Sequence, residues 1–212
     1  MFTVTRDEVR DLMIAFIVLS FCFAISNVGF DVHGIISILP IVMFGVGLGF
    51  LVHELGHKYT AMKCGCEAEF KLWPLGLVIA FVTALIGIVF ASPGEAKITP
   101  EDLPDEINGR IGIAGPMANM GLALLFIVIA LFLYPFSLHS SLFHLLFLVC
   151  TVGFSVNSFL ATFNILPLWS MDGTKVMKWS PKYWLAGFLI ALLMMLASVF
   201  IGAENMVMML IA

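Results

Sequence analysis

The chain has 212 residues, of which 61% are hydrophobic and 11% carry a charge. Because soluble domains typically have about 25% charged residues, this composition excludes an ordinary soluble protein and indicates an integral membrane protein whose surroundings are the lipid bilayer. The net charge is −4, and the sequence has no basic patch, so nucleic-acid binding is not expected.

The apolar runs predict the fold class. Several of them reach the roughly 18 to 20 residues that a bilayer-spanning helix needs, and the alternation of a transmembrane barrel is absent. We therefore expect an all-α polytopic membrane protein with about five to six transmembrane helices, forming one domain over residues 1–212. No small-residue cleavage site follows the first residues, so no removable signal peptide is expected.

The first two spans are predicted from about Leu12 to Phe30 and from about Ile35 to Met62. Thr5 and Glu8 form a capping-box pattern, which predicts a short amphipathic helix ahead of the first span. The second span contains three glycines that would let a neighbouring helix approach closely. These are Gly45, Gly47 and Gly49.

Near the end of the second span the chain reads His53-Glu54-Leu55-Gly56-His57. On a helix, residues four apart project from one face, so His53 and His57 could hold one metal ion with Glu54 beside them as general base. The alternative is a chance match, or two core histidines bonded to backbone carbonyls. Three ionisable groups in an apolar helix are costly unless partnered, which favours the metal site.

Residues Leu75 to Ala91 are apolar but form a short stretch for a helix that spans the bilayer. They are rich in β-branched residues and bounded by Pro74 and Pro93, which fits a strand pair or a re-entrant segment better than a helix.

An acidic loop follows. Further spans are predicted from Ile111 to Phe136, from Ser141 to about Leu166 and from about Tyr183 to Gly202, and the apolar tail 203–212 either completes the last span or lies at the interface.

The positive charges choose between a crossing and a re-entrant segment at 75–91. If this segment enters the membrane and returns, all ten Lys and Arg residues lie on one side, as the positive-inside rule requires. A single crossing would divide them between the two sides. The sequence therefore favours the re-entrant path, with the basic ends facing the cytoplasm.

Two histidines leave a zinc site one protein ligand short. On the re-entrant topology Asp172 returns to the membrane face that carries His57, whereas Asp31 lies on the far side. A helix cap followed by Gly173 is the alternative role for Asp172. With the histidine pair present, the third ligand is the favoured interpretation.

Three separated motifs now resemble those of the site-2 proteases, which are intramembrane zinc metalloproteases. The motifs are His53-Glu54-x-x-His57, Ala114-Gly115-Pro116-x-x-Asn119, and the segment from Asn164-x-x-Pro167 to Asp172-Gly173. The chain departs from the usual pattern with Ile165 in place of a proline and Met171 before the aspartate. It also leaves no room for the PDZ or CBS domains of many relatives.

This resemblance implies a three-helix core with one Zn2+ per chain on the cytosolic side, and a β-hairpin region between the first two core helices. Zinc held by His53, His57 and Asp172 would activate water, and Glu54 would transfer its proton to the leaving amine. Asn164 would donate to the substrate carbonyl or hold the unwound substrate, with a structural helix–helix bond as the alternative. Structural interhelical bonds are expected for two further residues, Asn119 and Asn157.

The implied substrates are transmembrane helices of membrane-bound proteins, cleaved by a multi-pass protease of the cell membrane. An edge strand between Cys66 and Ile98 could pair with the unwound substrate, and Leu77 to Val82 is the stretch in which we expect substitutions to impair cleavage. The main alternative is a membrane zinc transporter or sensor. Glu54 discriminates between the two, because transport does not need a base beside two metal ligands.

Overall fold

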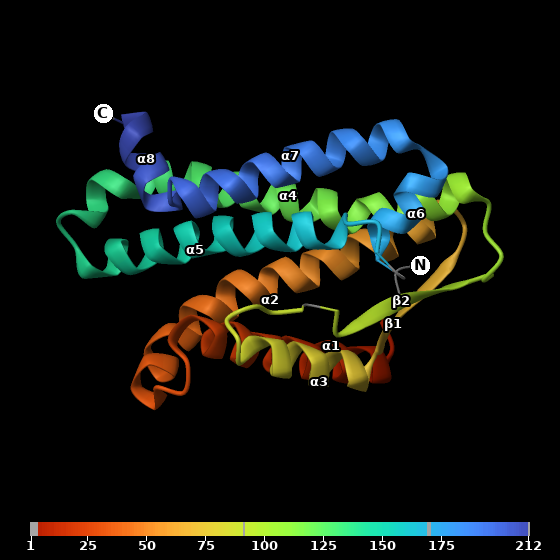
Figure 1. The fold of residues 1–212 in the computed structure, drawn as a ribbon, viewed down its shortest axis with the longest axis horizontal. Helices are drawn as coiled ribbons and strands as arrows, with labels where there is room; N and C mark the ends of the chain where they lie inside the picture. The colour runs from red at the N-terminus through yellow and green to blue at the C-terminus, as the bar shows by residue number, and fades with distance from the viewer. Residues whose placement is uncertain (1–3, 91, 169–170, 212) are drawn as a thin grey trace.

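The computed structural model describes residues 4–90, 92–168 and 171–211, and most of these are helical (Figure 1). The elements in chain order are α1 (Arg6–Val28), α2 (Val32–Lys63), β1 (Glu67–Leu72), α3 (Pro74–Ala84), β2 (Gly94–Thr99), α4 (Asp105–Ser137), α5 (Ser141–Asn164), α6 (Asp172–Trp179), α7 (Pro181–Phe200) and α8 (Ala203–Ile211). Five of the described helices, α1, α2, α4, α5 and α7, are long and apolar enough to cross a membrane. The predicted helical class therefore holds for most of the chain, and a small two-stranded sheet lies between α2 and α4, where a β-hairpin region was expected.

Side-chain caps fix the start of the first two helices. The Thr5 hydroxyl accepts a hydrogen bond from the Glu8 backbone amide at 3.1 Å, and the Asp31 carboxylate accepts one from the His33 amide at 3.1 Å. The predicted cap at Thr5 is confirmed. The short helix expected to lead into the first span is continuous with that span, because α1 runs without a break from Arg6 to Val28.

The glycines of α2 let two helices pack directly against it. A Cβ on Gly45 would lie 3.4 Å from the Gly153 Cα of α5, and a Cβ on Gly49 would lie 2.6 Å from the Asn157 Oδ1 of the same helix. On another side of α2, a Cβ on Gly47 would collide with the Phe16 ring of α1. The predicted close approach of neighbouring helices is confirmed.

The segment between α2 and α4 leaves the sheet and returns to it. β1 and β2 pair antiparallel, with Glu67 opposite Thr99 and Leu72 opposite Gly94, so the two ends of the intervening segment are adjacent. The predicted return to the same end is thus found. The expected strand pair within 75–91 is wrong, because Pro74–Ala84 form the helix α3 and the strands lie in the more polar flanks.

The two ends of the molecule differ. Figure 1 shows the sheet, α6 and the N-terminal side of α1 at one end, and α8 with the α4–α5 turn at the other.

Between α7 and α8 the chain turns at Gly202, which has a φ of 84°, so the apolar tail forms a separate helix instead of extending α7. Val207 of α8 is buried in an apolar cluster with α4 and α5.

Candidate metal centre

Three buried side chains from two elements meet at the sheet end of the molecule. His53 and His57 come from α2 and Asp172 from the first residue of α6. The Nε2 atoms of the two histidines lie 3.0 Å apart. The Asp172 Oδ2 atom lies 3.2 Å from Nε2 of His53 and 3.0 Å from Nε2 of His57. The structure therefore brings together the three residues predicted as metal ligands.

This triangle of atoms fits a zinc ion. Tetrahedral zinc with bonds of about 2.0–2.1 Å separates its ligand atoms by about 3.3–3.4 Å, close to the observed 3.0–3.2 Å edges. Gly115 of α4 covers the ligand nitrogens, and a Cβ there would lie only 2.5 Å from the His57 Nε2 and 2.7 Å from the His53 Nε2. Glycine keeps this space open.

The Nδ1 atoms of both histidines are engaged by oxygen atoms of α4. The His53 Nδ1 lies 2.7 Å from the Asn119 Oδ1, and the His57 Nδ1 lies 2.7 Å from the Ile111 carbonyl oxygen. A carbonyl oxygen only accepts, so each Nδ1 carries the hydrogen and each Nε2 offers a lone pair. The tautomer that α4 imposes is the one that a metal ion at Nε2 requires.

Asn119 belongs to a buried hydrogen-bond network across three helices. Its Nδ2 donates to the Gly49 carbonyl and to the Asn157 Oδ1, both at 2.9 Å. Asn157 in turn donates to the carbonyl oxygen of Gly153 at 2.8 Å. The predicted interhelical bonds are present. Asn119 also orients the candidate ligand His53, a role that the sequence did not reveal.

Asp172 follows a cap at Met171 and is therefore the first helical residue of α6, not the cap itself. Gly173 packs directly against the Ile165 carbonyl, which holds α6 against the end of α5. Trp169 and Ser170 of the predicted motif segment lie outside the described residues. Burial raises the pKa of Asp172, but His57, His53 and Lys175 together lower it below its usual range.

Glu54 lies beside the candidate ligands in a pocket of about 330 Å³. The residue is 9% exposed, and its Oε2 atom has no hydrogen-bond partner among the described residues. A buried polar atom without a partner is costly. This oxygen is therefore placed to receive a hydrogen bond from a molecule that enters the pocket.

Comparisons with known proteins identify the family. A protein of Methanocaldococcus jannaschii, provisionally named a zinc metalloprotease, is 37% identical over 184 residues, which cover 86% of this chain and 90% of that protein. The chain belongs to this family of zinc metalloproteases. No protein-family model and no solved structure matches it.

Two more distant relatives carry the same kind of name. A zinc metalloprotease of M. jannaschii is 27% identical over 67% of this chain and 34% of its own length. A provisionally named zinc metalloprotease of Bacillus subtilis is 27% identical over 68% of this chain and 70% of its own length. Zinc is accordingly the metal implied for the His53, His57 and Asp172 group.

In this metalloprotease Asn164 lines the same pocket as Glu54 and Asp172. Its Nδ2 donates to the Leu160 carbonyl one turn back in α5, at 2.8 Å. Among the described residues, the helix–helix bond considered as an alternative is not found for Asn164. Its role toward a substrate stays a prediction.

Lys175 is a pocket residue that the sequence analysis did not single out. Its Nζ lies 3.6 Å from the Asp172 Oδ1, while the other oxygen of Asp172 faces the two histidines. The spacing of three residues on α6 contained the signal, because residues i and i+3 are neighbours on a helix. The remaining histidines, His33, His139 and His144, lie in or beside the α1–α2 and α4–α5 turns, away from this group.

Proposed function

We propose that this metalloprotease is an intramembrane endopeptidase of the site-2 type, which cleaves peptide bonds within or near transmembrane helices of membrane-bound proteins. One observation carries the proposal. The candidate ligands His53 and His57, with Glu54 between them, are buried on a helix that is itself long and apolar enough to span the bilayer. A substrate for such a site is supplied most directly from within the membrane.

The residues divide the chemistry between them. Zinc, when held by His53, His57 and Asp172, supplies a Lewis acid that polarises the scissile carbonyl and acidifies water at the site. Glu54 removes a proton from the attacking water and passes it to the leaving amine. Asn164, at the pocket wall, donates to the substrate carbonyl oxygen or to the unwound substrate backbone.

The sheet supports a way to present the substrate. A helix hides its peptide bonds in internal hydrogen bonds, so a transmembrane substrate must unwind before it is cleaved. Consecutive residues of β2, from Gly94 to Ile98, line the pocket together with the candidate ligands. We propose that the unwound segment pairs with β2 as an added strand, and that tests belong on β2 rather than on Leu77 to Val82, which lie in α3.

The charge distribution supports a multi-pass protein with the site toward the cytoplasm. The basic residues fall at the start of α1, the end of α2, the sheet, the start of α4, α6 and the start of α7. These parts gather at the end of the molecule that holds the candidate site (Figure 1). The positive-inside rule favours this end on the cytoplasmic side.

A Glu54→Gln variant tests the proposed activity. In vesicles that contain a transmembrane peptide substrate, we expect cleavage to fall by about 10²- to 10⁴-fold, because the general base is lost. Zinc content should match that of the wild type, since Glu54 is not among the three candidate ligands.

The matched control for this test is Glu101→Gln, which changes an exposed acid away from the pocket. It should cleave as the wild type does. Unchanged cleavage by Glu54→Gln would contradict the proposal. A wild type that binds zinc but cleaves no membrane peptide would favour the zinc transporter or sensor.

A further inference from the structure

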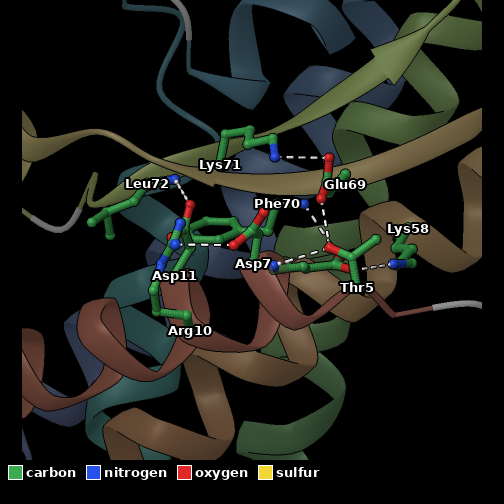
Figure 2. Close-up of polar contacts among 10 residues, drawn as sticks. Thr5, Asp7, Arg10, Asp11, Lys58, Glu69, Phe70, Lys71 and Leu72 are labelled. Atoms are coloured by element: carbon green, nitrogen blue, oxygen red, sulfur yellow. Dashed lines mark hydrogen bonds and ion pairs between the residues drawn. The ribbon is translucent and has the colours of Figure 1, made fainter.

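Two acids on the first turns of α1 reach the backbone of β1 (Figure 2). Glu8 Oε1 accepts a hydrogen bond from the Phe70 amide at 3.2 Å, and Asp11 Oδ2 accepts one from the Leu72 amide at 3.2 Å. Glu8 is 2% exposed and Asp11 is 7% exposed. Side chains of a helix thus supply hydrogen-bond acceptors to alternate amides of β1. In a larger sheet, the backbone of a third strand would supply them.

These two bonds show which edge of β1 faces α1. In an antiparallel ladder, alternate residues direct their backbone groups to opposite sides. Phe70 and Leu72 direct theirs to α1, so the odd-numbered residues of β1 face β2. The next odd-numbered residue agrees, because the Trp73 amide donates to the Pro93 carbonyl at 2.7 Å.

The same alternation identifies the outer edge of β2. Glu95 and Lys97 stand opposite the odd-numbered residues of β1 and therefore face β1. Gly94, Ala96 and Ile98 direct their backbone groups away from it, and all three line the pocket that contains Glu54. The sheet therefore has one edge occupied by α1 and one edge at the candidate active site.

Glu8 also connects this sheet to the helix that carries the candidate ligands. Its second oxygen, Oε2, lies 2.5 Å from the Nζ of Lys58, and Lys58 follows His57 in the chain. Both partners are buried, with Lys58 5% exposed and Glu8 2% exposed. One carboxylate therefore joins α1, β1 and α2 beside the metal site.

We propose that Glu8 and Asp11 are positioning residues for the proteolysis proposed above, on which this inference rests. They block the β1 edge and hold the register of the sheet relative to the candidate ligands, so that a substrate strand adds only to β2. A two-stranded sheet is marginally stable alone, and an open edge pairs readily with another strand. Carboxylates suit this role because they accept strong hydrogen bonds but cannot continue a ladder.

Asp11 is the better residue to change, because removing Glu8 would leave the buried Lys58 charge without this partner. Asp11→Asn keeps an oxygen that can accept from Leu72, whereas Asp11→Leu has nearly the same shape and no acceptor. Asp7→Leu is the control, since Asp7 pairs with Arg10 as Asp11 does, but forms no hydrogen bond with β1 among the described residues. Asp11→Ala repeats the loss of the acceptor without added apolar bulk, in case Asp11→Leu misfolds.

The first measurement needs no substrate. In the full-length protein, hydrogen exchange at the Leu72 amide should quicken by about tenfold or more in Asp11→Leu, because the oxygen that accepts from this amide is lost. Asp11→Asn and Asp7→Leu should exchange at Leu72 nearly as the wild type does. Equal exchange in the wild type and Asp11→Leu would overturn the inference, whether or not the protein cleaves membrane peptides.

The second measurement is cleavage of a transmembrane peptide, with products located by mass spectrometry. In Asp11→Leu we expect KM to rise by about tenfold with little change in kcat, products from neighbouring bonds as well as the wild-type bond, and wild-type zinc content. Asp11→Asn should restore the wild-type pattern. A single wild-type cleavage bond with wild-type KM in Asp11→Leu, or an equal defect in Asp11→Asn, would overturn the inference, whereas absence of cleavage by the wild type would count against the proposed function.

Discussion

At the residue scale, the candidate site depends on the carboxylate that completes the ligand triangle. Asp172 Oδ2 lies within 3.2 Å of both histidine Nε2 atoms, although 115 to 119 positions separate it from them in the chain. Zinc sites of hydrolases commonly use three protein ligands and leave one position open. Two histidines alone would hold zinc much more weakly.

We therefore expect Asp172→Ala to lose most of its zinc. The loss in affinity should exceed the roughly 10- to 100-fold that removal of an outer-shell partner costs, because a direct ligand is removed. Metal analysis of the purified protein measures this effect. Asp102→Ala, an exposed acid in the loop before α4, is the control and should retain zinc. Full zinc content in Asp172→Ala would remove this residue from the ligand set.

Lys175 should tune the site without binding the metal. Its ammonium lies near the Asp172 oxygen that faces away from the histidines, so it holds the carboxylate in its orientation. We expect Lys175→Met to weaken zinc affinity by about tenfold, measured by competition with a chelator. Lys178→Met changes an exposed lysine of the same helix and should have no effect. Equal affinities in the two variants would contradict this role.

The sequence could predict those site residues that lie close to one another in the chain. The spacing of His53, Glu54 and His57 sufficed because the helical period places them on one face. Topology and charge selected Asp172. The bonds from Asn119 and Ile111 to the histidines could not be predicted from spacing, because they join residues 66 and 54 positions apart through the packing of α4 on α2.

At the element scale, the region between α2 and α4 shows where local propensity was overridden. The β-branched residues of 75–91 suggested strands, yet Pro74 starts a helix whose first turn suits proline, and Ala80 and Ala84 are buried in its contact with α1. In apolar surroundings a helix satisfies its own backbone groups, whereas an isolated strand cannot. The strands formed where alternating, more polar sequence occurs, at Glu67–Leu72 and Gly94–Thr99.

The packing of α4 on α2 gives a prediction at the element scale. Gly115→Ala would place a Cβ 2.5 Å from the His57 Nε2, so we expect the histidine rings to shift and zinc affinity to fall. Overpacking of this kind typically lowers the free energy of unfolding by about 1–3 kcal/mol. Zinc titration and thermal unfolding measure the two effects.

A control for Gly115→Ala lies on the same helix. Gly121 has no neighbour within 4 Å of an added Cβ, so Gly121→Ala should keep its zinc. It should also be slightly more stable, by about 0.5–1 kcal/mol, because alanine favours a helix interior over glycine. If Gly115→Ala bound zinc as Gly121→Ala does, the space over the histidines would not be required for the metal.

At the scale of the whole molecule, the proposed orientation in the membrane rests on which parts of the chain lie at each end. The sheet, α6 and the helix ends that carry the basic residues lie together, and the α4–α5 turn lies at the opposite end (Figure 1). The return of the chain between β1 and β2 brings this about, because it places the start of α4 beside the end of α2. A single crossing at 75–91 would have put Asp172 and the histidines on opposite faces.

Cysteine labelling in intact cells tests this arrangement. We expect a membrane-impermeant maleimide to label His139→Cys, in the α4–α5 turn, from outside the cell, and to label Asp102→Cys, between β2 and α4, only after the membrane is opened. Both positions are exposed, so accessibility reports the side of the membrane. The four native cysteines, Cys22, Cys64, Cys66 and Cys150, are free and should first be replaced by serine or alanine. Labelling of Asp102→Cys from outside would place the sheet and the candidate metal centre on the outer face and would contradict the proposed orientation.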